Sequence, residues 1–310
     1  LTAFVGKTPK LKIYDRIVEN VTDKQGALQF LDDLERSVDF ISRVKKPTKE
    51  EWHDDDEIVE NLTGLDAISD GGFYPILLAG SHDKFNDGEM KKLIELVVKL
   101  HFRAKTVCSV SFTEIEGLVV KVCSEIKRNT SYFLPEVINE MVAWSKYPSN
   151  DEFELKFKQL ELNSSAKARY VLSQIEYSMA GGRSTQSWHI DPDIQIEHIM
   201  PKSIEGDWFN ELQARSELNT AAEINDYHKR NLNKLGNLTL ISPRANAIIQ
   251  NDAYRKKLNG TGAYDGYRSD MAKMTSRLVD YQEWGQEQIE IRQGVFLLQA
   301  KNIWDLQNNN

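Results

Sequence analysis

The chain has 310 residues, a formal net charge of −8 and an ordinary composition, with 40% hydrophobic and 28% charged residues. This length predicts about two domains of ~150 residues each. No apolar run approaches the ~18 residues that a membrane-spanning helix needs, and no secretory signal is visible, which excludes a membrane protein and favours the cytoplasm. Cys108 and Cys123 have no metal-binding spacing and fit buried thiols in a reducing compartment.

Helical patterns dominate the first 180 residues. Over residues 26–44, apolar side chains recur at three- and four-residue spacing, which predicts a helix with one apolar face. Further amphipathic helices are predicted over residues 87–104, 112–128, 135–147 and 164–182. Because Gly181 and Gly182 end the last of these, we expect a helical region over residues 1–180 and a second domain over residues 181–310.

The pattern changes after this boundary. The stretches "DIQIEHI" (193–199) and "GNLTLIS" (236–242) alternate as strands do, and "PRANAIIQN" (243–251) begins with proline and predicts a short helix. Two longer helices are predicted over residues 268–284 and 286–305. The expected fold is therefore mainly α: a helical bundle region, then a small ββα domain with C-terminal helices.

Two ionisable residues, Glu197 and His198, end the first strand just before Pro201. A histidine can deprotonate water near neutral pH because its ordinary pKa is ~6.5. Successive side chains of a strand point to opposite faces, but at a strand end two neighbours can flank one site. We expect a further oxygen ligand from Asn246 on the short helix. A carboxylate and an amide oxygen suit Mg²⁺ better than Zn²⁺.

A basic segment lies downstream of this pair. Between His228 and Gly260, seven basic residues and one acidic residue give +6, so the rest of the chain carries −8 − 6 = −14. We interpret the segment as a phosphate-binding surface beside the predicted site. The nucleic-acid-binding candidates are Lys229, Arg230, Lys234, Arg244 and Lys257, with Arg244 and Lys257 the strongest.

The motifs "IEHIMP" (196–201) and "LGNLTLIS" (235–242), with Asn246 nine residues after Asn237, resemble the HNH (ββα-metal) endonucleases. More narrowly, they are similar to the HNH domain of GmrSD-type modification-dependent restriction systems, and SspE-type effectors carry the same kind of domain. The run "NDAYRKK" (251–257) matches a downstream motif of that family, with Tyr254 in place of phenylalanine.

The resemblance implies roles for four residues: His198 as general base, Glu197 and Asn246 at the metal, and Asn237 holding the loop that carries the histidine. It implies a Mg²⁺- or Mn²⁺-dependent DNA endonuclease or nickase of bacterial anti-phage defence, with phosphorothioate or glucosylated DNA as the expected modified substrates. Relatives carry an N-terminal sensor and NTPase domain with a "DGQQR"-like motif. That motif is absent from this sequence, so we expect a C-terminal half or a split system with a separate sensor.

Other interpretations remain open. The domain could be an inactive HNH fold that only binds or senses nucleic acid, an HNH-type RNA nuclease, or part of a protein whose helical half is a scaffold for a sensor. The Glu-His pair alone also fits a polar strand end, and the basic segment a solvated face. His228 fits either a surface position or a contact with phosphate or metal. His189, Asp191 and Asp193 fit either a metal cluster or the lead-in to the strand.

Overall fold

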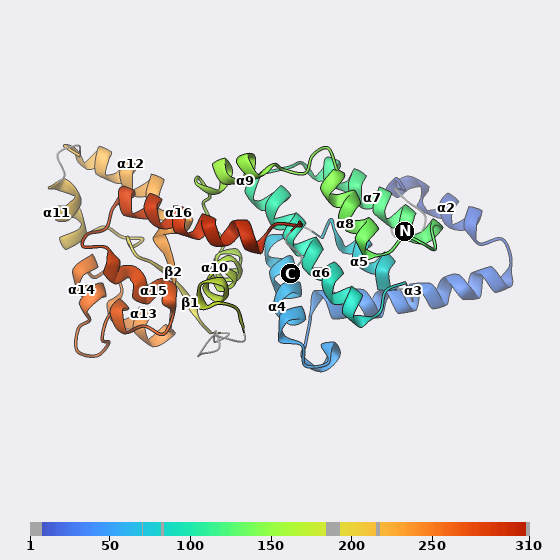
Figure 1. Cartoon of the computed structure of the whole chain (residues 1–310), viewed down its shortest axis with the longest axis horizontal. Helices are drawn as coiled ribbons and strands as arrows, with labels where there is room; N and C mark the ends of the chain where they lie inside the picture. The colour runs from blue at the N-terminus through green and yellow to red at the C-terminus, as the bar shows by residue number, and fades with distance from the viewer. Residues whose placement is uncertain (1–7, 70, 82–83, 184–192, 215–217, 308–310) are drawn as a thin grey trace. The chain divides into compact units, whose positions relative to one another are not determined.

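A computed structural model describes residues 8–69, 71–81, 84–183, 193–214 and 218–307. The chain divides into an N-terminal unit, Leu1–Ser149 with Trp304–Asn310, and a C-terminal unit, Asn150–Ile303 (Figure 1). The described residues are mainly helical and contain one two-stranded sheet. No helix among them has the length and apolar character needed to cross a membrane.

The N-terminal unit is built from helices. These are α2 (Ile13–Asn20), α3 (Lys24–Lys45), α4 (Asp56–Ile68), α5 (Tyr74–Ser81), α6 (Asp87–His101), α7 (Phe112–Arg128) and α8 (Leu134–Ala143). Helix α7 begins where the sequence predicts because Ser111 caps it and Glu114 completes a capping box. Both cysteines are buried and neither forms a disulfide, as expected. On α3 the apolar face remains exposed, with Leu31 at 58% and Val38 at 66%.

The C-terminal unit combines helices with the sheet. Its elements are α9 (Asn150–Phe157), α10 (Ser165–Ala180), β1 (Gln195–His198), α11 (Asp207–Gln213), α12 (Ala221–Leu232), β2 (Leu238–Ile241), α13 (Pro243–Ile249), α14 (Tyr254–Asn259), α15 (Lys273–Ser276) and α16 (Gln286–Ile303). Helix α10 packs against β1, β2, α15 and α16. The compact unit therefore begins at Asn150, about thirty residues before the expected boundary at 180, because α10 belongs to its core.

The two strands pair antiparallel, with Glu197 opposite Thr239 and His198 opposite Leu238. Helix α13 follows β2 directly and packs against β1. It begins at Pro243, and the side chain of Ser242 accepts a hydrogen bond from the backbone of Ala245. The order strand, connection, strand, helix that the sequence predicts is therefore present, and it brings α13 beside the end of β1.

The prediction of a continuous helix over residues 268–284 is wrong. The structure has two 3₁₀ turns there, at Tyr267–Ser269 and Arg277–Asp280, with the four-residue α15 between them. The buried carboxylate of Glu176 on α10 accepts hydrogen bonds from the backbone of Lys273 at 2.7 Å and Met274 at 2.8 Å. This contact caps the start of α15, so a side chain from another helix sets where this short helix begins.

Helix α16 holds the backbone segment that leads into β2. Arg292, 3% exposed, donates to the carbonyls of Gly236 and Leu238 at 2.8 and 2.6 Å. The backbone N–H of Gly236 donates to Gln293 at 3.0 Å. A Cβ at Gly236 would collide with the carbonyl oxygen of Ile289. Glycine is thus needed at this position for close contact with α16.

Candidate active site

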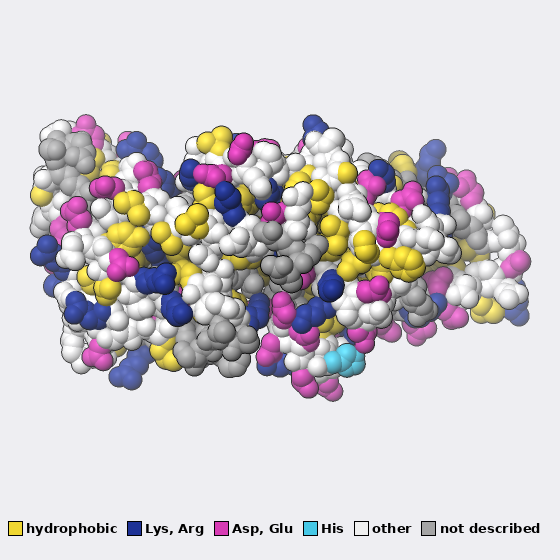
Figure 2. Space-filling view, viewed as in Figure 1, with side chains coloured by type: hydrophobic (Ala, Val, Ile, Leu, Met, Phe, Trp, Pro, Cys, Tyr) yellow, Lys and Arg dark blue, Asp and Glu magenta, His cyan; other side chains and the backbone are white. Residues whose placement is uncertain are grey.

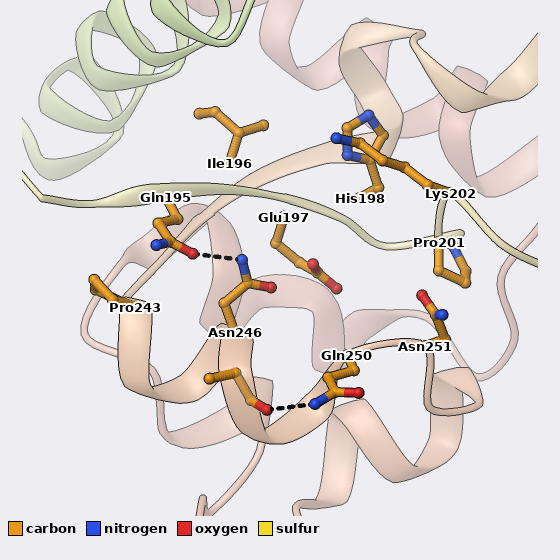
Figure 3. A pocket seen from close by; sticks show the side chains of 11 residues that line it. Gln195, Ile196, Glu197, His198, Pro201, Lys202, Pro243, Asn246, Gln250 and Asn251 are labelled. Atoms are coloured by element: carbon orange, nitrogen blue, oxygen red, sulfur yellow. Dashed lines mark hydrogen bonds between the residues drawn. The ribbon is translucent and has the colours of Figure 1, made fainter.

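A cavity of about 370 Å³ lies between the end of β1 and α13 (Figure 3). Glu197, His198 and Asn246 all line it, together with Gln195 and Lys202. The first two come from β1, and Asn246 comes from the middle of α13. The fold therefore brings to one cavity three residues that are up to 49 positions apart, as the sequence predicts.

Glu197 is only 5% exposed and is held by two partners. Its Oε1 accepts hydrogen bonds from Nζ of Lys257 at 2.5 Å and from the hydroxyl of Tyr267 at 3.0 Å. Burial raises the pKa of Glu197 and lowers that of Lys257, and the attraction between the two charges opposes both shifts. Since both bonds go to Oε1, Oε2 stays outside the ion pair.

Asn246 lies on the same side of β1 as Glu197 (Figure 3). Its Nδ2 donates a hydrogen bond to Oε1 of Gln195 at 2.7 Å. The amide oxygen, at the other end of the group, points toward the cavity and toward Glu197 (Figure 3). Two oxygen donors, one from the carboxylate and one from the amide, therefore face a common space.

His198 lies on the opposite face of β1, as strand alternation requires (Figure 3). Its Nε2 is 3.2 Å from Oδ1 of Asn233. A carbonyl oxygen only accepts hydrogen bonds, so Nε2 carries the proton and Nδ1 keeps the lone pair. Burial lowers the pKa of His198 to about 4, so the imidazole is neutral at pH 7. A neutral imidazole with a free Nδ1 is able to accept a proton.

Asn237 is fully buried, and its side chain makes four hydrogen bonds. Oδ1 accepts from the backbone of Met200 at 2.8 Å and from the indole of Trp284 at 2.9 Å. Nδ2 donates to the carbonyls of Met200 at 3.0 Å and Leu232 at 2.9 Å. These bonds fix the backbone that directly follows His198, which is the contact expected of a loop-holding asparagine.

The structure does not support a phosphate contact for Lys257, because its side chain is fully buried against Glu197. Lys234 is also partly buried and pairs with Glu290 at 3.3 Å. Of the other basic candidates, Lys229, Arg230 and Arg244 are exposed, but none of the five lines the cavity. On the face drawn in Figure 2, basic side chains are scattered among acidic ones over the part that contains α11 and α14.

His228 is buried rather than on the surface, and its Nε2 is 2.8 Å from the carbonyl oxygen of Pro201. It supports the segment after β1, so the expected surface position is wrong, and its Nε2 contacts the protein backbone rather than phosphate or metal. His189 and Asp191 lie outside the described residues, so the cluster suggested with Asp193 has no structural description.

Sequence reasoning missed four residues that contact the site: Gln195, Asn233, Lys202 and Tyr267. Gln195 could have been found, because it precedes Glu197 by two residues and alternation places both on one face. Lys202 is exposed, lines the cavity and acts electrostatically on His198. Asn233 and Tyr267 come from the end of α12 and from the turn before α15, and no local pattern indicates either contact.

The donors at the cavity fit a hard divalent cation. A carboxylate oxygen and an amide oxygen are ligands that Mg²⁺ and Mn²⁺ accept, and both ions are commonly completed by water and phosphate. In the described ranges there is no group of three or more His, Cys, Asp or Glu side chains placed to hold a metal.

Residues 147–297 match the family described as GmrSD restriction endonucleases, C-terminal domain. Residues 147–297 are therefore a GmrSD-type restriction endonuclease C-terminal domain. The matched residues include β1, β2, α13 and every residue that lines the cavity. The expected family is thereby confirmed, and with it a restriction endonuclease-type domain whose substrate class is DNA. No curated protein matches the chain.

Proposed function

We propose that the C-terminal unit is an HNH endonuclease or nickase that hydrolyses phosphodiester bonds in DNA with Mg²⁺ or Mn²⁺. The observation that carries this proposal is the convergence of Glu197, His198 and Asn246 on one cavity. The β1, β2, α13 order and the GmrSD C-terminal domain match support it. We further propose a bacterial restriction system against modified phage DNA, in which a sensor and NTPase domain, in the same protein or separate, controls cutting.

The proposed role of His198 is to activate water. Nε2 donates to Asn233, which fixes the ring and leaves Nδ1 as the atom that takes the proton. Because burial keeps the imidazole neutral, the base needs no prior deprotonation near pH 7. The hydrogen bonds of Asn237 to the backbone of Met200 keep the end of β1 in place during this step.

Glu197 and Asn246 would hold the cation through Oε2 and the amide oxygen. Such an ion, when bound, supplies Lewis-acid stabilisation of the charge that develops on the leaving oxygen. Lys257 and Tyr267 keep the other carboxylate oxygen occupied, so Glu197 presents a single oxygen to the cavity. His198 is the last residue of β1, so the base and the oxygen donors leave the strand on different faces but flank the same cavity.

Exposed basic residues would bind the DNA backbone around the cavity. Lys202 is the best placed of them, because it lines the cavity beside His198 (Figure 3). Lys229 and Arg230 on α12 and Arg244 on α13 are exposed and remain proposed phosphate contacts. The buried Lys257 is not among them.

A plasmid assay with Mg²⁺, Mn²⁺ or EDTA tests this function. We expect nicking or cutting of DNA with either cation, no cleavage in EDTA, and no loss of total RNA incubated in parallel. The assay should compare unmodified plasmid with phosphorothioate and glucosylated DNA, and a difference among them would identify the modification that is recognised. Degradation of RNA but not DNA would support an RNA nuclease instead. DNA binding without cleavage under every condition would support a sensing module.

A further inference from the structure

We propose that Gln195 is a positioning residue that makes Asn246 present its oxygen, rather than its NH₂ group, to the cavity. This inference rests on the proposed function, because it concerns how the proposed cation site is built. The evidence is the hydrogen bond from Nδ2 of Asn246 to Oε1 of Gln195 at 2.7 Å. Neither the family match nor the sequence motifs assign a role to Gln195.

The strand places Gln195 where this contact is possible. Gln195 and Glu197 are two residues apart on β1, so their side chains leave the same face of the strand. Helix α13 packs against β1, and its capped N-terminus fixes the backbone of Asn246. A fixed backbone leaves the χ1 and χ2 rotations of the asparagine side chain, and the bond from Nδ2 to Gln195 restricts the rotation of the amide plane.

The chemistry of the amide makes this restriction matter. An asparagine side chain has one acceptor oxygen and one NH₂ donor, and only the oxygen binds a cation. The carbonyl oxygen of Gln195 can be satisfied by the NH₂ group but not by the amide oxygen. A rotation of the amide by about half a turn would therefore break the bond to Gln195 and point the donor group at the cation.

The other oxygen donor of the site has the same kind of support. Lys257 and Tyr267 hold Oε1 of Glu197 and leave Oε2 to the cavity. Gln195 holds Nδ2 of Asn246 and leaves the amide oxygen. In contrast, the side chain of Gln250, which also lines the cavity, donates to the carbonyl of Ala247 at 3.0 Å rather than to the side chain of Glu197 or Asn246. Gln195 is thus the glutamine that has the geometry for this role.

Mn²⁺ binding to the full chain without DNA tests the proposal. Free Mn²⁺ can be counted by electron paramagnetic resonance, so the readout does not depend on cleavage. Gln195→Met keeps the length of the side chain and removes the acceptor, and we expect its Kd for Mn²⁺ to rise about 10-fold. Gln195→Glu keeps an acceptor and should bind at least as tightly as the parent. Both should melt like the parent, because Gln195 is exposed.

Two further variants separate the possible failures. Asn246→Ala removes the proposed ligand and should weaken binding at least as much as Gln195→Met. Gln213→Met, at an exposed position on α11 that does not line the cavity, should leave binding unchanged.

The outcomes distinguish the two proposals. If Asn246→Ala weakens binding and Gln195→Met does not, the positioning role is wrong and the cation site stands. Equal weakening by Gln195→Glu and Gln195→Met would also overturn that role. A parent chain that binds no Mn²⁺, or an Asn246→Ala variant that binds as the parent does, would overturn the cation site itself.

Discussion

Nζ of Lys257 lies 2.5 Å from Oε1 of Glu197, and the lysine is fully buried. This ion pair joins α14 to the end of β1 across 60 positions of sequence. The same ammonium also approaches the carbonyls of His198 and Ile199 at 3.3 and 3.4 Å. A lysine that the sequence suggested for DNA backbone contact therefore supports the strand end that carries the proposed catalytic residues.

Lys257→Met should destabilise the C-terminal unit by about 3–5 kcal/mol, because it leaves the carboxylate of Glu197 buried without its partner. Urea unfolding followed by circular dichroism measures the change. The neighbouring Lys256→Met is a matched control, since Lys256 is exposed and pairs with Asp207 at 3.2 Å on the surface. Its cost should stay below about 1 kcal/mol. If Lys257→Met costs no more than Lys256→Met, the buried pair does not stabilise the fold.

Asn237→Ala should also destabilise the fold, by about 3 kcal/mol, because four buried hydrogen-bond partners lose their contact. DNA cleavage should fall as well, since the backbone after His198 loses its anchor. The measurements are urea unfolding and plasmid nicking. Asn225→Ala, at an exposed position on α12, should change stability by less than about 0.5 kcal/mol. An Asn237→Ala variant as stable as Asn225→Ala would contradict the loop-holding role.

Much of the fold could be predicted from local patterns. Helix α7 begins and ends where its apolar spacing predicts, and α13 begins at Pro243 as expected. The two strands, which the structure places at 195–198 and 238–241, were predictable because alternation and flanking turn residues mark them. The helix expected over residues 268–284 is absent, and the short α15 within that range begins where Glu176, about a hundred residues earlier, caps it. Periodicity carries no information about such a distant carboxylate.

The candidate site, like the fold, was predictable where local motifs mark it and not where distant contacts decide. Glu197, His198 and Asn246 were predicted from the residues themselves and Asn237 from the resemblance to HNH endonucleases, and the structure brings the first three to one cavity. What the sequence could not indicate is which charged side chains are buried. Lys257 stands among exposed basic residues in the sequence, and only the tertiary fold turns it toward Glu197. Exposure, not residue type, decides which lysines can reach DNA.

Lys202 should replace Lys257 as a phosphate contact. Because one neutralised phosphate changes the log–log salt dependence of binding by about 0.9 on duplex DNA, Lys202→Ala should lower that slope by about this amount. Fluorescence anisotropy with labelled DNA at several salt concentrations measures the slope. Lys24→Ala, at an exposed position of the N-terminal unit, is the control and should leave the slope as in the parent. An unchanged slope for Lys202→Ala would show that this lysine contacts no phosphate.

His198 should make the fold less stable in mild acid. Burial lowers its pKa in the folded state to about 4, whereas an unfolded histidine titrates near ~6.5. Between these values the unfolded chain binds more protons, so the free energy of unfolding falls as the pH decreases. Melting in EDTA from about pH 7 to about pH 5 should lower the Tm more for the parent than for His198→Gln. Parallel decreases would mean that the histidine titrates normally.

The central claim is that Glu197, His198 and Asn246 form one cation-dependent nuclease site, and plasmid nicking by His198→Ala tests it most directly. Supercoiled plasmid should be incubated with Mg²⁺ and parent or variant protein, and DNA binding measured on the same samples. We expect nicking to fall on the order of 10²–10⁴-fold while binding is largely kept, because the variant lacks only the proton acceptor. A His198→Ala protein that nicks as fast as the parent would contradict the account.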